Sequence, residues 1–174
     1  LAGKPAQLAP RLTGQHPEQP DMAQCAAMGR TLAQLHLALQ GYPLARRNAH
    51  GADWWQAVAA RRRPLMTAEE QALLDRTLET LASIKQRYPS LPAGLIHGDL
   101  FRDNTLFTGN SVTGVLDFSE CSHDILLLDI AITANDFCRR WPGHAPDGVR
   151  MAAFVGGYGE VRALGAEEQA ALPV

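Results

Sequence analysis

Residues 95–104 of the chain read Leu-Ile-His-Gly-Asp-Leu-Phe-Arg-Asp-Asn, and residues 115–118 read Val-Leu-Asp-Phe. Apolar, β-prone runs at 95–96, 105–107 and 112–116 flank the polar loop, and Thr108-Gly109-Asn110 provides turn residues between the last two runs. The pattern predicts a short strand, a polar loop, and a β-hairpin with Asp117 at its end. Polar side chains beside buried strands are costly unless they are paired or used, so this stretch is the main candidate for a functional site.

The polar side chains of this stretch follow the spacing H-x-D-x-x-x-x-N with a later D-F. Kinases use this spacing for one base and two magnesium ligands, because phosphoryl transfer needs an oriented hydroxyl and cations that neutralise phosphate charge. On this hypothesis Asp99 accepts the hydroxyl proton, while Asn104 and Asp117 present oxygen atoms to Mg²⁺. His97 is predicted to support the loop by hydrogen bonds. The structural alternative is a buried His97 and aspartates that only form turns.

The composition is that of an ordinary soluble domain, with 174 residues, 46% apolar side chains and a formal net charge of −2. A chain of this length can bury one sizeable core. The low net charge argues against nucleic acid or an anionic membrane as a partner, and no apolar run approaches the ~20 residues of a membrane span. Cys25, Cys121 and Cys138 are odd in number and widely spaced. They favour reduced thiols in the cytoplasm over a disulfide framework or a zinc site.

Helices are predicted over most of the remaining chain, which indicates an α+β fold that is mostly helical. Asp21 with Gln24 and Thr67 with Glu70 form capping-box patterns in front of apolar residues at helical spacing. Asp147 is predicted to cap a third helix. Further helices are expected at 53–63, 125–139 and 166–171. His36 lies beside the apolar face of the first helix, and we interpret it as a buried structural histidine.

Two motifs resemble one known family. The loop sequence H-G-D-L-F-R-D-N-T-L-F at 97–107 resembles that of the aminoglycoside phosphotransferase and choline kinase superfamily, and within it that of bacterial type II homoserine kinases. The run L-D-I-A-I-T-A-N-D-F-C at 128–138 is similar to the downstream motif of the same enzymes. Phe137, where the family often has Trp, and residues 119–124 depart from the family pattern. The resemblance implies ATP-dependent phosphorylation of L-homoserine, with Mg²⁺, on the pathway to threonine.

The resemblance also implies a domain organisation, in which the chain is the C-terminal lobe of a protein-kinase-like fold. Residues 1–14 would be the end of the N-terminal lobe and the interlobe hinge, where backbone groups of Ala9 and Arg11 would meet adenine. Residues 15–174 would be the helical catalytic lobe, which we expect to be truncated at its C-terminus. No Gly-rich loop is present, and Lys4 and Lys85 do not fit the nucleotide lysine. We therefore expect that the N-terminal lobe is absent and that this fragment alone is inactive.

Further site residues follow from the resemblance and from charge. Asp129 lies on an otherwise apolar helical stretch, and the equivalent residue of the family braces the catalytic loop. Asn135 and Asp136 are candidates for the ammonium group of an amino-acid substrate, and Arg102 is the candidate for its carboxylate or for the transferred phosphoryl group. Surface salt bridging is the alternative explanation for these three residues.

Three functional hypotheses remain open at the level of sequence. The first is the small-molecule kinase, with homoserine favoured and choline, an aminoglycoside or another amino alcohol as the alternative acceptor. The second is a metal-dependent hydrolase that uses His97, Asp99, Asp117 and His123 as ligands, although the paired-histidine spacing of such enzymes is missing. The third is a kinase-like lobe that binds without catalysing, against which the complete set of Asp99, Asn104 and Asp117 argues.

Overall fold

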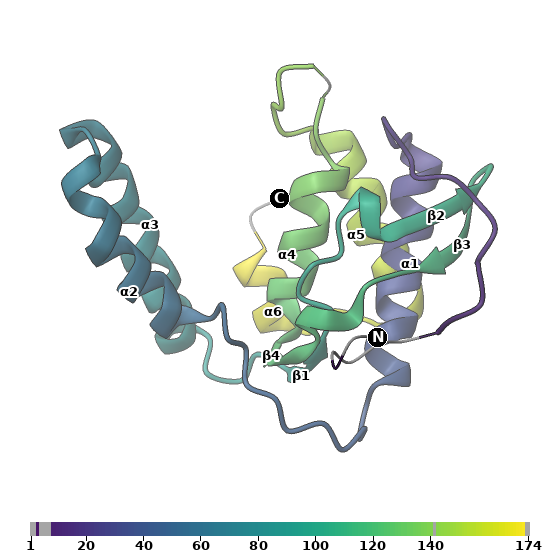
Figure 1. The fold of residues 1–174 in the computed structure, drawn as a ribbon, viewed down its shortest axis with the longest axis horizontal. Coiled ribbons are helices and arrows are strands. Elements are labelled where there is room, and N and C mark those ends of the chain that lie inside the picture. Colours follow the sequence, from purple (N-terminus) through teal and green to yellow (C-terminus); the bar gives the residue numbers. More distant parts are fainter. Residues whose placement is uncertain (1–2, 4–7, 141, 173–174) are drawn as a thin grey trace.

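The structure is a computed structural model that describes residues 3, 8–140 and 142–172. Lys4, discussed above, lies outside the described residues. A bundle of helices forms the body, two small sheets lie against it, and one pair of helices stands apart from the rest (Figure 1). This arrangement confirms the prediction of a mostly helical α+β fold with a small hairpin. Among the residues that the structure describes, no helix is long and apolar enough to cross a membrane.

The first helix, α1 (Met22–Ala38), begins as the capping box predicted. Asp21 accepts a hydrogen bond from the backbone amide of Gln24 at 2.8 Å, and the Gln24 side chain accepts one from the Asp21 amide at 3.1 Å. The apolar face of α1 is buried against α5 (Gly148–Val161), which Asp147 caps as expected. These two helices form the centre of the core.

Two glycines permit the close approach of α1 and α5. A Cβ atom at Gly29 would lie 2.0 Å from the carbonyl oxygen of Phe154, and one at Gly157 would lie 2.1 Å from the carbonyl oxygen of Ala26. Real Cβ atoms do not come this close to backbone, so only glycine fits at either position. The fully buried aromatic side chains of Phe154 and Tyr158 fill the space beside this contact.

Each of the two sheets has two antiparallel strands. The hairpin of β2 (Thr105–Thr108) and β3 (Ser111–Val115) was predicted, and Gln15 extends it by pairing with Phe107. The other sheet pairs β1 (Ala93–Ile96) with β4 (Ser122–Ile125), with Ile96 opposite Ser122. The strand β4 was not predicted, because its residues Ser-His-Asp-Ile lack an apolar alternation.

The helices α2 (Ala52–Arg62) and α3 (Ala68–Arg87) form the hairpin that stands to one side of the body (Figure 1). A short 3-10 turn, Arg63–Leu65, joins them, and α3 begins at the predicted capping box of Thr67 and Glu70. The remaining helices are α4 (Leu126–Phe137) and α6 (Ala166–Ala171). In α4 one face carries buried side chains, Asp129 among them, and this face points to the core.

Candidate active site

The predicted catalytic loop connects β1 to β2 and depends on a glycine. Gly98 has φ +80°, and a Cβ atom there would lie 3.1 Å from the carbonyl oxygen of Glu120. This left-handed conformation suits glycine and strains other residues. The H-G-D sequence therefore allows the loop to turn sharply against the segment that follows β3.

His97 is fully buried and joins this loop to the end of β3. Its Nε2 lies 2.8 Å from the carbonyl oxygen of Leu116, and its Nδ1 lies 3.3 Å from the backbone amide of Asp99. A neutral imidazole satisfies both contacts when Nε2 donates and Nδ1 accepts. Since Leu116 directly precedes Asp117, His97 ties together the two parts of the chain that carry the candidate carboxylates.

Asp99 and Asn104 are in direct contact. The side-chain amide of Asn104 donates to the Asp99 carboxylate at 3.1 Å and to the Asp99 backbone carbonyl at 2.8 Å. Burial raises the pKa of Asp99, against the opposing effect of the hydrogen bond from Asn104. A carboxylate with a raised pKa is the stronger proton acceptor, which suits a general base.

Asp117 follows β3 at the head of the 3-10 turn Phe118–Glu120. Its backbone is left-handed at φ +56°, which is uncommon for a residue with a side chain. Hydrogen bonds from Ser119 lower the pKa of the Asp117 carboxyl. The negative charge of Asp117 also acts on Asp99, so the two carboxylates lie within electrostatic reach of each other. The backbone amide of Leu116, the residue before Asp117, donates to the Asn104 carbonyl at 2.8 Å, so the chain enters the Asp117 turn beside the catalytic loop.

The buried carboxylate of Asp129 lies beneath the catalytic loop. It accepts hydrogen bonds from the backbone amide of His97 at 2.8 Å and from that of Gly98 at 2.9 Å. Its third partner is His36 Nε2 at 3.0 Å, and both side chains are fully shielded from solvent. These bonds offset the cost of burying a charged group. His36 is buried, as the sequence predicted.

The three predicted substrate residues are only partly brought together. Asp136 accepts hydrogen bonds from the backbone amide of Arg102 at 2.8 Å and from its Nε at 3.0 Å. The pair lines a cavity of about 350 Å³ with His16, Phe101 and neighbouring residues. Asn135 is exposed and paired with Arg139, and it lines a different surface depression.

Ala9 and Arg11, the candidates for adenine contacts, are exposed in the segment that precedes Gln15. The next residue, Leu12, packs over the hairpin, where its Cδ1 would lie 2.7 Å from a Cβ atom added at Gly114. The segment therefore reaches the hairpin that follows the catalytic loop.

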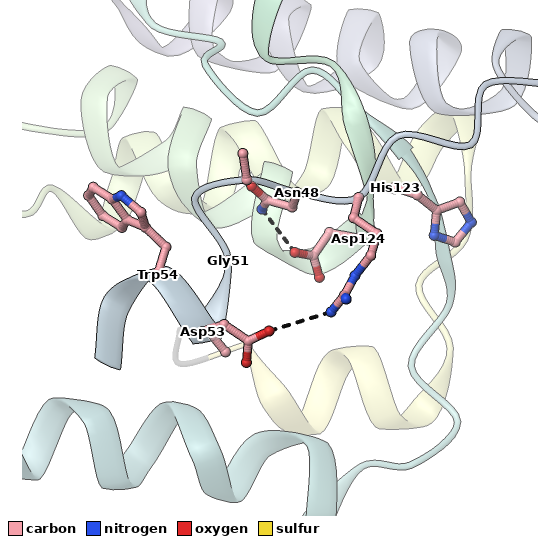
Figure 2. A pocket seen from close by; sticks show the side chains of 9 residues that line it. Asn48, Gly51, Asp53, Trp54, His123 and Asp124 are labelled. Atoms are coloured by element: carbon pink, nitrogen blue, oxygen red, sulfur yellow. Dashed lines mark hydrogen bonds and ion pairs between the residues drawn. The ribbon is translucent and has the colours of Figure 1, made fainter. Parts of the chain in front are cut away.

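A second cavity, of about 380 Å³, lies between the α1–α2 connection, the start of α2 and the strand β4 (Figure 2). Asn48 donates to Asp124 at 2.9 Å there, and Arg47 and Asp53 form an exposed ion pair at 3.5 Å. The same connection contacts the turn after Asp117, because His50 pairs with Glu120 at 3.0 Å. Sequence reasoning missed this cavity, since no motif joins residues 47–54 to residues 123–124.

The oxygen atoms of Asn104 and Asp117 fit a magnesium ion. The amide nitrogen of Asn104 is directed to Asp99, so its oxygen is the atom left to face a cation, and Asp117 is held in its ionised form. The hydrolase hypothesis finds no support, because both ring nitrogens of His97 are engaged in hydrogen bonds within the loop. Within the described ranges, no three His, Cys, Asp or Glu side chains gather as a metal site.

Comparison with known sequences identifies the family. The profile of the phosphotransferase enzyme family matches residues 1–164. The chain belongs to this family. It is 42% identical over 173 residues to a homoserine kinase of Methylobacillus flagellatus. This alignment covers 99% of the chain and 53% of the relative. A homoserine kinase of Neisseria meningitidis serogroup B is 38% identical over 99% of the chain and 56% of its own length. The chain thus spans about half the length of these phosphotransferases.

Solved structures of other phosphotransferases and kinases share the fold. An aminoglycoside-3'-phosphotransferase of type VIII superimposes with a TM-score of 0.64 at 20% identity, covering 92% of the chain and 64% of that protein. A choline kinase from Cryptosporidium parvum Iowa II superimposes with a TM-score of 0.54 at 15% identity, covering 80% and 49%. At such low identity the likeness concerns the fold alone, which is that of a kinase-like C-terminal lobe.

Proposed function

We propose that this chain is the catalytic lobe of an ATP-dependent kinase that phosphorylates the hydroxyl of L-homoserine. The observation that carries the proposal is the similarity of essentially the whole chain to homoserine kinases, at 38–42% identity, together with the contact between Asp99 and Asn104. The alternative acceptors are choline, an aminoglycoside or another amino alcohol.

In the proposed reaction Asp99 acts as the general base. Its carboxylate accepts the proton of the acceptor hydroxyl while the hydroxyl oxygen forms a bond to the γ-phosphorus of ATP, and the bond from that phosphorus to the bridging oxygen breaks to release ADP. Asn104 keeps the carboxylate oriented. Asn104 and Asp117 would hold Mg²⁺, which when bound neutralises charge on the phosphates.

The acceptor is proposed to bind at the cavity beside Arg102 and Asp136. A zwitterionic amino acid offers a carboxylate for Arg102 and an ammonium group for Asp136. Because these two side chains already pair with each other, the acceptor would contact them as an ion pair. Asn135 stays a prediction, since its side chain is directed to Arg139.

Binding of the nucleotide is proposed to require groups beyond the catalytic loop and the acceptor cavity. Ala9 and Arg11 would contribute backbone contacts to adenine, in keeping with the prediction that residues 1–14 form the end of the N-terminal lobe and the interlobe hinge. A phosphate-covering loop and a lysine would come from an N-terminal lobe. The amicoumacin kinase that shares this fold was solved with AMP-PNP and Ca²⁺. A cytoplasmic location is proposed because Cys25, Cys121 and Cys138 are free thiols.

A panel of acceptors tests the proposal. The chain is joined to the N-terminal lobe of the Methylobacillus flagellatus relative, and ADP release is measured with Mg-ATP and L-homoserine, choline or kanamycin. The highest kcat/KM is expected for L-homoserine. A clear preference for another acceptor would correct the substrate, whereas ADP release that no acceptor stimulates would refute the kinase assignment. The Asp99→Ala variant controls for contaminating kinases.

A further inference from the structure

A chain of hydrogen-bonded side chains, most of them buried, runs from α6 to the catalytic loop. Asp129 contacts His36, and His36 Nδ1 lies 2.7 Å from the hydroxyl of Tyr158. The Tyr158 hydroxyl lies 3.2 Å from Nη1 of Arg162, and the same Nη1 lies 2.8 Å from Oε1 of Glu168. Tyr158 and Glu168 are 0% and 2% exposed, and the Arg162 side chain between them is 15% exposed. The proposed chemistry uses neither residue.

The types of donor in this chain determine where its protons lie. Arginine can only donate hydrogen bonds, so the Tyr158 oxygen accepts from Arg162. The single O–H of Tyr158 is then left to donate a hydrogen bond to His36 Nδ1, which accepts it. Burial raises the pKa of Tyr158 to about 12, so the hydroxyl keeps that proton at neutral pH.

An imidazole whose Nδ1 accepts a hydrogen bond carries its proton on Nε2. In His36 this is the nitrogen that faces Asp129 at 3.0 Å. The Asp129 carboxylate therefore receives three N–H donors, two from the loop backbone and one from His36. With the opposite tautomer, a nitrogen lone pair would face the carboxylate and repel it.

The far end of the chain is also fixed. Glu168 accepts a hydrogen bond from the backbone amide of Gly165 at 2.9 Å, at the start of α6. Its carboxylate faces both terminal nitrogens of Arg162. Arg162 is thereby held with one nitrogen toward the Tyr158 hydroxyl.

We propose that Tyr158, oriented by Arg162 and Glu168, is a positioning residue for the catalytic loop. Its hydroxyl engages Nδ1 of His36 while Asp129 engages Nε2, and the ring fixed in this way keeps Asp129 on the amides of His97 and Gly98, and through them fixes the position of Asp99. The structural part of this inference stands independently, and its catalytic part rests on the proposed kinase function.

The tautomer of His36 is measured first, in the chain labelled with ¹⁵N-histidine. Long-range ¹⁵N–¹H correlations distinguish the two neutral tautomers from the doubly protonated ring, and the spectrum of His36→Gln assigns the signal. We expect a single form with the proton on Nε2. A proton on Nδ1, in either the other tautomer or the cation, would overturn the inference without reference to any activity.

The Tyr158→Phe variant then removes only the hydroxyl. We expect the ¹⁵N signals of His36 to shift, because Nδ1 loses its hydrogen-bond partner, and the amides of His97 and Gly98 to exchange with solvent faster. Tyr88→Phe is the matched control, because its hydroxyl bonds to the Ala170 carbonyl at the surface. A His36 signal unchanged in Tyr158→Phe contradicts the proposal. If this variant does not fold, the pair Arg162→Met with Glu168→Gln provides the same test without leaving a buried charge unpaired.

Kinetics in the kinase completed by an N-terminal lobe test the catalytic part. Tyr158→Phe is expected to lower kcat by about 2- to 30-fold, the range of coupling between packed residues, with the KM for acceptor and nucleotide unchanged. A changed His36 signal with an unchanged kcat would remove the catalytic role of Tyr158. If no variant or wild-type protein has kinase activity, the proposed function fails while the tautomer measurement keeps its meaning.

Discussion

The side-chain amide of Asn104 donates to Asp99 twice, to its backbone carbonyl at 2.8 Å and to its carboxylate at 3.1 Å. The double contact fixes the carboxylate relative to the loop backbone. It also directs the nitrogen of the amide inward, which leaves the oxygen to face a cation. One asparagine thereby orients the proposed base and supplies a proposed metal ligand.

Replacing Asp99 should abolish most of the activity without loss of fold. In the complete kinase we expect Asp99→Asn to lower kcat by about 10²–10⁴-fold, the usual contribution of a positioned base. The KM values should change little, because asparagine has nearly the same size as aspartate and can still form hydrogen bonds. Steady-state ADP release measures the effect, and circular dichroism checks the fold. A kcat within a factor of a few of the wild type would exclude Asp99 as the base.

The titration of Asp99 should respond to Asn104. Burial raises the pKa of Asp99, and the hydrogen bond from Asn104 partly offsets this, so Asn104→Leu should raise the pKa further. Since the base must be ionised, activity falls as the pH drops through this pKa, and the raised value moves that loss to higher pH. Carboxyl ¹³C titration of the chain without metal measures the shift. Asp117 is the internal reference, because its pKa is lowered. An unchanged or lower pKa for Asp99 in Asn104→Leu contradicts the assignment.

The cation site can be tested on the chain itself. Mn²⁺ is a paramagnetic substitute for Mg²⁺, and it should broaden the amide signals near Asn104 and Asp117 selectively. Asp117→Asn should weaken this broadening, whereas Asp53→Asn, which changes an exposed carboxylate of α2, should not. Broadening spread evenly over the surface carboxylates would indicate that these oxygens form no specific site.

The close packing of α1 on α5 predicts that adding one methyl group at the contact will strongly lower the stability of the fold. Gly157→Ala should destabilise the fold by about 1–3 kcal/mol or more, because the new Cβ would lie 2.1 Å from the Ala26 carbonyl oxygen. Gly159→Ala is the matched control in the same helix. Nothing lies within 4 Å of its Cβ position, so it should be neutral or stabilise by about 0.4–1 kcal/mol. Urea unfolding of the two variants measures the difference, and equal stabilities would show that α1 and α5 do not approach so closely.

The features that could be predicted from the sequence were those that depend on residues close together in the chain. The capping boxes at Asp21 and Thr67 and the turn at Gly109-Asn110 depend on neighbours within a few residues, and the helices and the hairpin begin and end near the predicted positions. The strand β4 was missed because what makes it a strand is its pairing with β1, about thirty residues earlier.

The partners of single polar residues were equally hard to predict. The sequence indicated that Asp129 needs a partner, but not that the contact of His36 with Tyr158 would complete it, because that contact joins residues 122 positions apart. Asn135 and Asp136 are neighbours in sequence, yet successive residues of a helix point about 100° apart. Only Asp136 therefore meets Arg102.

The pairing of Arg102 with Asp136 leads to the sharpest test of the acceptor site. If this pair binds the zwitterionic acceptor, Arg102→Ala should raise the KM for homoserine and leave the KM for ATP unchanged, since a charge-assisted hydrogen bond to the substrate carboxylate is lost. Asp124→Asn provides the contrast, because Asp124 lines the separate cavity of Figure 2. An unchanged homoserine KM and kcat in Arg102→Ala would remove Arg102 from the site, and a raised KM confined to Asp124→Asn would place the acceptor in that cavity instead.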